Sequence, residues 1–269
     1  ERQILKKIRL ERTGYYWFQG LPGTGKTLLL YDMAMKLSVR QQVCLIHCGE
    51  AVEQWKVLHE RLRRVKYLAD SQITSDLLSG ASAVLVDEAH LLSQEKLEYL
   101  LRYCGKRPVI FSSDYENMLS PEELDRAAVH ALEQISGIQS FRLTNRIRTN
   151  AEISSFIQNM MCLPERKKGR HFPHVTVLYA NDDREADVLL SDAQHQGYQV
   201  ILNEAEPAIC AGRLAMVLDQ RYFYDRQNYL RSDDRSVRRL FHQLNGAKEE
   251  LLLVVKQNEP LYAALLDLL

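Results

Sequence analysis

A glycine-rich loop near the start of the chain restricts the possible fold more than any other feature. Residues 20–27 read G-L-P-G-T-G-K-T and follow an apolar run at residues 15–19, which predicts a strand, a tight loop and then a helix. The spacing fits the phosphate-loop pattern G-x-x-x-x-G-K-[ST]. In that arrangement, successive backbone N–H groups and the helix N-terminus face a bound phosphate. We therefore expect a phosphate-binding α/β domain.

Each residue type in this loop suits contact with a nucleotide. The expected cofactor contacts are Gly20, Pro22, Gly23, Thr24, Gly25, Lys26 and Thr27. Lys26 can reach the β- and γ-phosphates, and the hydroxyl of Thr27 suits Mg²⁺. ATP and Mg²⁺ are therefore the predicted ligands. A chance glycine-rich turn is the alternative, and the predicted strand and helix on either side argue against it.

A second apolar run ends in two acidic residues. Residues 84–90 read V-L-V-D-E-A-H, which predicts a buried strand with Asp87 at its end. A carboxylate there lies beside the phosphate loop and can hold Mg²⁺, while Glu88 is placed to polarise an attacking water as a general base. His90 either couples the γ-phosphate to the next strand or only begins a helix.

Further polar side chains follow the predicted strand at residues 108–113. The sequence continues D-Y-E-N, so Asp114 and Asn117 would lie at the sheet edge where open α/β folds bind ligands. They either sense the γ-phosphate or only cap the next helix. Residues 141–150, F-R-L-T-N-R-I-R-T-N, leave a similar choice between a solvated basic turn and an arginine that reaches the γ-phosphate.

Apolar runs alternate with helix-like segments along the whole chain. The predicted strands are residues 15–19, 42–47, 83–87, 108–113, 175–180, 199–203, 214–218 and 251–255. The predicted helices are residues 25–38, 51–64, 93–103, 121–135, 149–161, 183–195, 235–246 and 259–268. This alternation predicts right-handed crossovers and parallel sheets. We expect a first lobe over residues 1–162, a linker at 163–173 and a second, smaller lobe over 174–269.

Composition limits the other function classes. Lys+Arg and Asp+Glu both number 35, so nucleic-acid binding would need a local basic groove. The five cysteines show no C-x-x-C spacing and indicate mostly buried thiols in a reducing cytoplasm. No apolar stretch approaches the length of a membrane span, so no membrane contact is expected. Because the chain begins at Glu1 without a methionine, we expect it to be part of a larger protein.

These motifs, in this order, resemble those of superfamily 1 helicases, and most closely the Schlafen-type (group 3) DNA/RNA helicase-like domain of bacterial ATP-binding proteins. The resemblance is carried by G-T-G-K-T-L-L-L-Y-D, V-D-E-A-H, F-S-S-D-Y-E-N-M-L-S-P-E-E and L-T-N-R-I-R-T-N-A-E-I-S-S-F-I. It implies a P-loop NTPase with two tandem RecA-like lobes, ATP between them and single-stranded DNA or RNA across the top. It also implies catalytic roles for Lys26, Glu88 and Arg148, with Arg148 contacting the γ-phosphate.

Three positions depart from this family pattern. Asn117 stands where the family has a glutamine that senses the γ-phosphate. Residues 208–219 contain Gly212 but no Gly-x-Glu stretch. Gly246, in the string N-G-A-K, replaces the arginine with which the second lobe would reach ATP. The second lobe is therefore expected to be divergent and hydrolysis to be weak, unless Arg238 or Arg239 substitutes.

Two functions remain open from these features. The first is a motor that hydrolyses ATP and steps along single-stranded DNA or RNA, although about 60 residues between the loop and Asp87 leave no room for large inserted subdomains. The second is a non-motor switch that gates a partner protein or fused effector, in antiviral defence on family grounds. Arginines interleaved with aromatics at residues 221–239 favour contact with a single strand, unless those aromatics form core. A small-molecule kinase is disfavoured because no substrate-lid segment is visible.

Overall fold

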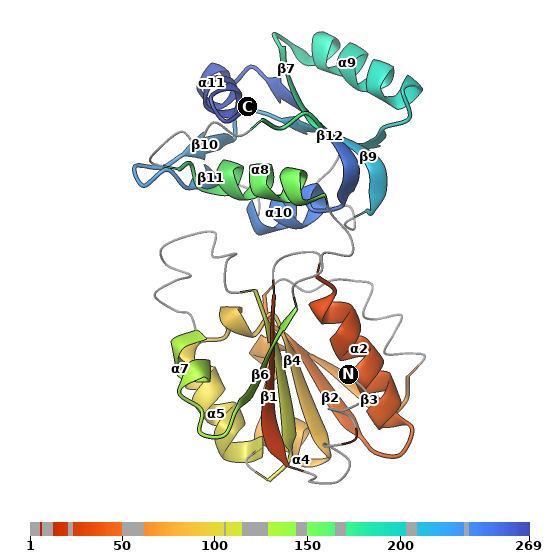
Figure 1. The fold of residues 1–269 in the computed structure, drawn as a ribbon, viewed down its shortest axis with the longest axis vertical. Helices are drawn as coiled ribbons and strands as arrows, with labels where there is room; N and C mark the ends of the chain where they lie inside the picture. Colours follow the sequence, from red (N-terminus) through yellow and green to blue (C-terminus); the bar gives the residue numbers. More distant parts are fainter. Residues whose placement is uncertain are drawn as a thin grey trace. The chain divides into compact units, whose positions relative to one another are not determined.

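The computed structural model of the chain describes residues 6, 13–20, 24–49, 62–104, 106–114, 129–143, 150–164, 171–202, 209–233 and 237–269. The chain divides into two compact units, Glu1–Asn145 and Arg146–Leu269, each with helices packed on a parallel sheet (Figure 1). The predicted α/β class with parallel sheets is therefore confirmed. Helix α8 (Ala151–Met161) contacts strand β12 (Ala247–Lys256) of the second unit. The boundary between the units thus precedes the predicted linker at residues 163–173.

The first unit contains a six-stranded sheet in the order β3-β2-β4-β5-β1-β6, and every neighbouring pair of strands is parallel. The strands are β1 (Gly14–Gly20), β2 (Val43–His47), β3 (Val65–Ala69), β4 (Ala83–Asp87), β5 (Pro108–Ser113) and β6 (Gln139–Leu143). Strands β4 and β5 are buried along their whole length, as expected for a parallel sheet covered on both faces. Because parallel strands end at the same edge, the ends of β1, β2, β4 and β5 bring the polar motifs together.

Helices cover both faces of this sheet (Figure 1). Successive side chains of a strand point to opposite faces, so Tyr16 and Phe18 of β1 pack with Leu30 of α2 (Lys26–Ser38) on one face. Trp17 lies on the other face in the same core as Leu100 of α5 (Gln94–Cys104). Among the described residues, this unit also has the helical elements η1 (Asp70–Gln72), α4 (Ser75–Ser79), η2 (Ala89–Leu91) and α7 (Val129–Glu133). The phosphate-loop helix α2 is thus fixed to the sheet by apolar packing.

The second unit contains a four-stranded parallel sheet in the order β7-β12-β9-β8. Its other strands are β7 (Val175–Ala180), β8 (Gln199–Ile201) and β9 (Ala211–Leu218), and its other helices are α9 (Asp183–His195), α10 (Val237–Leu244) and α11 (Glu259–Leu266). Strand β12 is central, and its residues Leu251–Val255 are buried because both edges pair and both faces are covered. No helix in the described part of the chain has the length and apolar character needed to cross a bilayer.

An antiparallel hairpin of β10 (Tyr222–Tyr224) and β11 (Leu230–Ser232) carries the aromatic residues that the sequence linked to a single strand. Tyr222 is 1% exposed, and the Tyr224 hydroxyl donates a hydrogen bond to the Met160 carbonyl at 2.8 Å. Phe223 is 44% exposed. Tyr222 and Tyr224 therefore serve the packing of the second unit, whereas the Phe223 side chain is exposed.

Candidate functional site

The glycine-rich loop meets helix α2 through a backbone that only glycine adopts easily. Gly25 is the N-cap of α2 and has φ 84° and ψ 20°, in the left-handed region. At the end of β1, a Cβ on Gly20 would lie 2.7 Å from the Thr24 hydroxyl and 2.8 Å from the Leu143 carbonyl oxygen. One glycine is therefore required by conformation and the other by close packing, as the motif implies.

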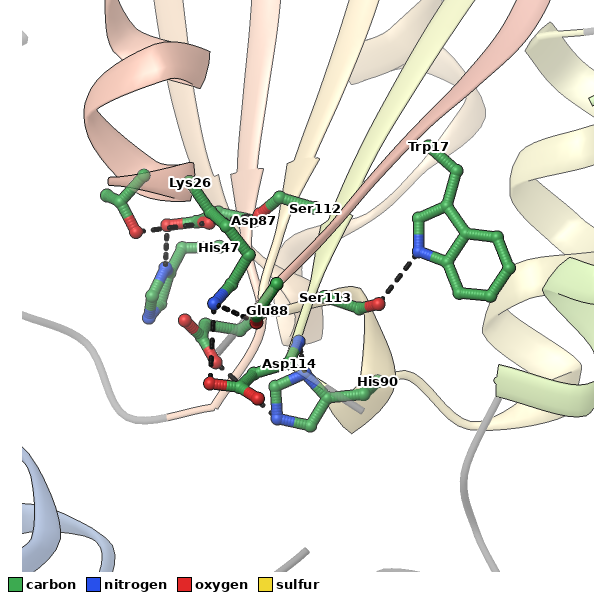
Figure 2. A network of polar contacts seen from close by, with 11 residues as sticks. Trp17, Lys26, His47, Asp87, Glu88, His90, Ser112, Ser113 and Asp114 are labelled. Atoms are coloured by element: carbon green, nitrogen blue, oxygen red, sulfur yellow. Dashed lines mark hydrogen bonds and ion pairs between the residues drawn. The ribbon is translucent and has the colours of Figure 1, made fainter. Parts of the chain in front are cut away.

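The Lys26 side chain lies in the interior at the end of this loop, only 6% exposed. Its ammonium donates to the Gly20 carbonyl at 2.6 Å and to Asp114 Oδ2 at 3.3 Å (Figure 2). Asp114 is also buried, with 4% of its side chain exposed. Burying a cation is costly unless anionic or carbonyl oxygens surround it. The Gly20 carbonyl and the Asp114 carboxylate supply these oxygens and so stabilise the buried Lys26 ammonium.

Asp87 stands at the centre of the polar network at the end of β4. Its Oδ1 atom accepts hydrogen bonds from the Ser112 hydroxyl at 2.5 Å and the Thr27 hydroxyl at 3.3 Å (Figure 2). Its Oδ2 atom lies 3.4 Å from Nδ1 of His47. The carboxylate is 1% exposed, and it is approached from α2, β5 and β2 at once.

The residues around Asp87 fit Mg²⁺. The Thr27 hydroxyl and the Asp87 carboxylate are hard oxygen donors, and Asp87 Oδ2 is buried and accepts no hydrogen bond within the described residues. In that same part of the chain, no group of three or more His, Cys, Asp or Glu side chains could hold a metal ion by itself. Mg²⁺ needs only one or two protein carboxylates when phosphates and waters complete its shell. The donors therefore suit an ion that arrives with nucleotide phosphates.

Glu88 follows Asp87 in an unusual backbone conformation. Its φ of 54° and ψ of 40° lie in the left-handed region, which costs a non-glycine residue about 1 kcal/mol or more. The Leu91 N–H donates to the Glu88 carbonyl at 2.9 Å and holds the turn η2 in place. The turn leaves the Glu88 side chain 14% exposed, beside the buried network. Strained residues of this kind gather at functional sites.

His90 connects the end of β4 to the end of β5. Its Nδ1 atom accepts the backbone N–H of Asp114 at 3.2 Å, so the proton of the neutral ring sits on Nε2. Nε2 lies 3.5 Å from Glu88 Oε2. The ring is buried, and Figure 2 shows it beside the Asp114 side chain. The predicted contact with the next strand is therefore present, and its link to the γ-phosphate stays a prediction.

The structure gathers eight of the predicted site residues at the carboxyl edge of the first sheet: Gly20, Thr24, Gly25, Lys26, Thr27, Asp87, Glu88 and Asp114. Four others lie outside the described residues: Pro22, Gly23, Asn117 and Arg148. Sequence reasoning missed Ser112 and His47, which contact Asp87, and Trp17, whose indole N–H donates to Ser113 Oγ at 2.7 Å. Each lies in a strand of this sheet, but only the strand order places them beside the site.

The cysteines are unsuited to nucleophilic chemistry at this edge. Cys44, Cys48 and Cys104 are buried, and all five cysteines are free thiols. Burial raises the pKa of Cys44 to about 12. Burial, followed by the negative charges of Asp70 and Asp87, also raises the pKa of Cys48 well above its usual value. These thiols therefore stay protonated and serve as small apolar core groups.

The position of the missing second-lobe arginine has a packing reason. A Cβ on Gly246 would lie 2.0 Å from the Ile209 carbonyl oxygen and 2.9 Å from that of Gln243. The Gly246 carbonyl in turn accepts the Ala211 N–H at 3.1 Å, at the start of the β9–β12 pairing. No side chain fits there without moving the backbone. A substitute role for Arg238 or Arg239 on α10 stays a prediction.

The sequence matches no protein-family model and no curated protein. Among solved structures, the chain is similar to Pif1 helicase from Candida albicans, with 14% identity, 72% of this chain and 53% of that chain covered, and a TM-score of 0.42. The chain is also similar to Pif1 helicase from Bacteroides in complex with ADP-AlF3 and ssDNA, with 14% identity, 72% of this chain and 56% of that chain covered, and a TM-score of 0.40. A third similar structure is AMPPCP-bound DnaA from Aquifex aeolicus, with 15% identity, 72% of this chain and 60% of that chain covered, and a TM-score of 0.37. The chain spans little more than half the length of these proteins.

Proposed function

We propose that the first unit binds ATP with Mg²⁺ at the carboxyl edge of its six-stranded sheet and hydrolyses it. The observation that carries this proposal is the set of contacts at the end of the glycine-rich loop, where Lys26 donates to Gly20 and Asp114 and the neighbouring Thr27 donates to Asp87. A cation, a hydroxyl and a carboxylate held together away from water match the needs of a phosphate chain and its metal. No purely structural role requires this combination at the start of a helix.

Each residue has a distinct part in the proposed reaction. Lys26 binds the β- and γ-phosphate oxygens, while Thr27 and Asp87 hold Mg²⁺, which when bound neutralises charge on those oxygens. Glu88 accepts the proton of the water that attacks the γ-phosphorus, and ADP and inorganic phosphate are released. The Nε2–H of His90 faces the Glu88 carboxylate and keeps it oriented toward that water.

Four further residues complete the proposed site on sequence grounds. Pro22 and Gly23 continue the phosphate loop, Asn117 contacts the γ-phosphate beside Asp114, and Arg148 stabilises the charge of the transition state. We assign the chain on its motifs to the Schlafen-type branch of superfamily 1, with two RecA-like lobes. In this assignment it acts on or senses single-stranded DNA or RNA in the cytoplasm, as part of a larger protein.

A non-motor switch is the second candidate function. It is favoured by Gly246, whose packing against Ile209 excludes the arginine that the motor pattern places in the second lobe. Without that arginine, hydrolysis would be slow, and the bound ATP would keep the protein in one conformation. Such a state could gate a partner protein or a fused effector, as in antiviral defence.

The rate of ATP hydrolysis with and without single-stranded DNA or RNA separates the two functions. A motor predicts stimulation by the single strand that disappears in Glu88→Gln, because the amide cannot accept the proton. A switch predicts tight ATP binding and a slow rate that the single strand does not change. If neither ATP binding nor hydrolysis is detected for the wild-type chain, the proposed function is wrong.

A further inference from the structure

Two adjacent serines at the end of β5 have different surroundings. Ser112 and Ser113 are both completely buried, and they are neighbours in the chain. Because successive side chains of a strand alternate between faces, their hydroxyls point to opposite sides of the sheet. Ser112 donates to Asp87 Oδ1 at 2.5 Å, whereas Ser113 accepts the Trp17 indole N–H at 2.7 Å (Figure 2). One hydroxyl therefore faces the predicted metal site and the other faces the core.

The register of the sheet explains why Ser112 reaches Asp87. Strand β4 lies between β2 and β5, and Val86 pairs with Phe111, so Ser112 comes level with Asp87. On the other side, His47 of β2 is the register partner of Asp87. Both neighbouring strands thus present a polar side chain to the same carboxylate, one toward each oxygen.

We infer that Ser112 is the positioning residue for the metal-holding carboxylate of Asp87. This inference rests on the proposed function. The Ser112 hydroxyl can only donate to a carboxylate oxygen, and its short bond fixes Oδ1 toward Thr27, the other expected Mg²⁺ contact. Partners that orient a metal-binding carboxylate typically change metal affinity by about 10-fold to 100-fold when they are removed. Ser112 therefore sets the affinity for Mg²⁺ without touching the nucleotide.

The test compares Ser112→Ala with Ser113→Ala in the full 269-residue chain. A fluorescent ATP analogue reports binding while free Mg²⁺ is titrated, and the same affinity is measured in EDTA. We expect Ser112→Ala to raise the half-saturating Mg²⁺ concentration roughly tenfold and to leave binding in EDTA unchanged. Ser113→Ala should stay within about twofold of the wild type in both conditions, since its hydroxyl does not face Asp87.

Ser112→Thr provides the rescue, because it keeps a hydroxyl at this position and should return Mg²⁺ dependence toward that of the wild type. Melting curves of all three variants show that each is folded at the assay temperature. Equal Mg²⁺ dependence in Ser112→Ala and Ser113→Ala overturns this inference alone. A wild-type chain without saturable, Mg²⁺-dependent binding overturns the proposed function and this inference with it.

Discussion

Both sheets of this chain end in charged side chains, but the charges are buried at the edge of the first sheet and exposed at the edge of the second. In the first unit, Lys26 and Asp114 pair at 3.3 Å with side chains 6% and 4% exposed. In the second unit, Lys256 pairs with Asp183, whose side chains are 23% and 81% exposed. A buried pair must overcome a desolvation penalty, whereas a surface pair gains and loses little. Among the described residues, the buried pair lies at the first edge and the exposed pair at the second, and buried charges of this kind are frequent at ligand sites.

Polar groups at the second edge serve the structure instead. Asn258 caps α11 by accepting the Leu261 N–H at 3.2 Å, and its amide donates to the carbonyls of Asp219 and Tyr222 at 2.9 and 2.7 Å. Asp219 also pairs with the Arg221 guanidinium. These contacts tie helix α11 to the hairpin and the sheet. Within the described part of this edge, these polar groups therefore contribute to the packing of the second unit.

The largest effect should separate the two ion pairs. Asp114→Ala leaves the Lys26 ammonium buried without the Asp114 carboxylate, and should lower the free energy of unfolding by about 3–5 kcal/mol. Asp183→Ala should lower it by less than about 1 kcal/mol. Urea unfolding followed by tryptophan fluorescence reports the first unit, since both tryptophans, Trp17 and Trp55, fall within it by number. Circular dichroism covers the second unit. Equal losses would contradict the contrast between the edges.

A glycine in each unit offers the next comparison. Gly246→Ala would push a Cβ to 2.0 Å from the Ile209 carbonyl, and the resulting overpacking should lower the free energy of unfolding by about 3 kcal/mol. Gly80 has φ −79°, and no atom lies within 4 Å of the position that a Cβ would take. Gly80→Ala should therefore raise the free energy of unfolding, by less than about 1 kcal/mol. Thermal melting measures both. A wild-type Tm for Gly246→Ala would show that a Cβ is tolerated there and would contradict the packing reason for the missing arginine.

Two asparagines of the second edge test its structural role. Asn258→Ala removes a helix cap and two further hydrogen bonds, one of them buried, and should lower the free energy of unfolding by about 1–2 kcal/mol without changing ATP affinity. Asn181→Ala removes an exposed bond to Glu185 and should cost about 0.5 kcal/mol or less. Urea unfolding and ATP titration provide the two readouts. Loss of ATP affinity in Asn258→Ala would give the second edge a ligand role that the account denies it.

The smallest effect concerns acid stability. Burial alone would raise the pKa of Asp219, but hydrogen bonds and charge from Arg221 outweigh it and lower the pKa below its ordinary 3.8. A lowered folded pKa gives stability that is present above 3.8 and lost as pH falls through the folded value. Arg221→Ala should therefore destabilise at pH 7 by less than about 1 kcal/mol, and the difference should shrink as the pH falls below 3.8. Tm values measured from pH 7 to pH 3 check this. A difference that grows in acid would contradict it.

The sequence predicted the parts of the fold in which local pattern and burial agree. The runs at residues 83–87 and 108–113 begin with apolar stretches and end in polar residues, and each forms a fully buried strand. Strand β3 was missed because V-K-Y-L-A is short and half exposed, next to a segment with helical character. The described residues 62–64 just before it form a turn, and the rest of the helix predicted at residues 51–64 lies outside the described residues.

The candidate site divides in the same way. The placement of Lys26, Thr27 and Asp87 at one sheet edge could be predicted, because it follows from motif spacing along the chain. Ser112 and His47 could not, because their contact with Asp87 depends on β4 lying between β2 and β5. Spacing along the chain carries no record of strand order. The missing second-lobe arginine was already visible in the sequence as Gly246, and the structure adds that the Ile209 carbonyl occupies the space beside it.

Calorimetric titration of ATP in the presence of Mg²⁺ tests the central claim most directly. We expect one ATP site per chain in the wild type and unchanged binding in Lys256→Ala. Lys26→Ala should bind ATP at least about a hundredfold more weakly, because the Lys26 ammonium is the group expected to bind the phosphates. Those two lysines lie at the edges of the two sheets, one buried and one at the surface. Wild-type affinity in Lys26→Ala, or a loss in Lys256→Ala instead, would contradict the assignment of the nucleotide to the first unit.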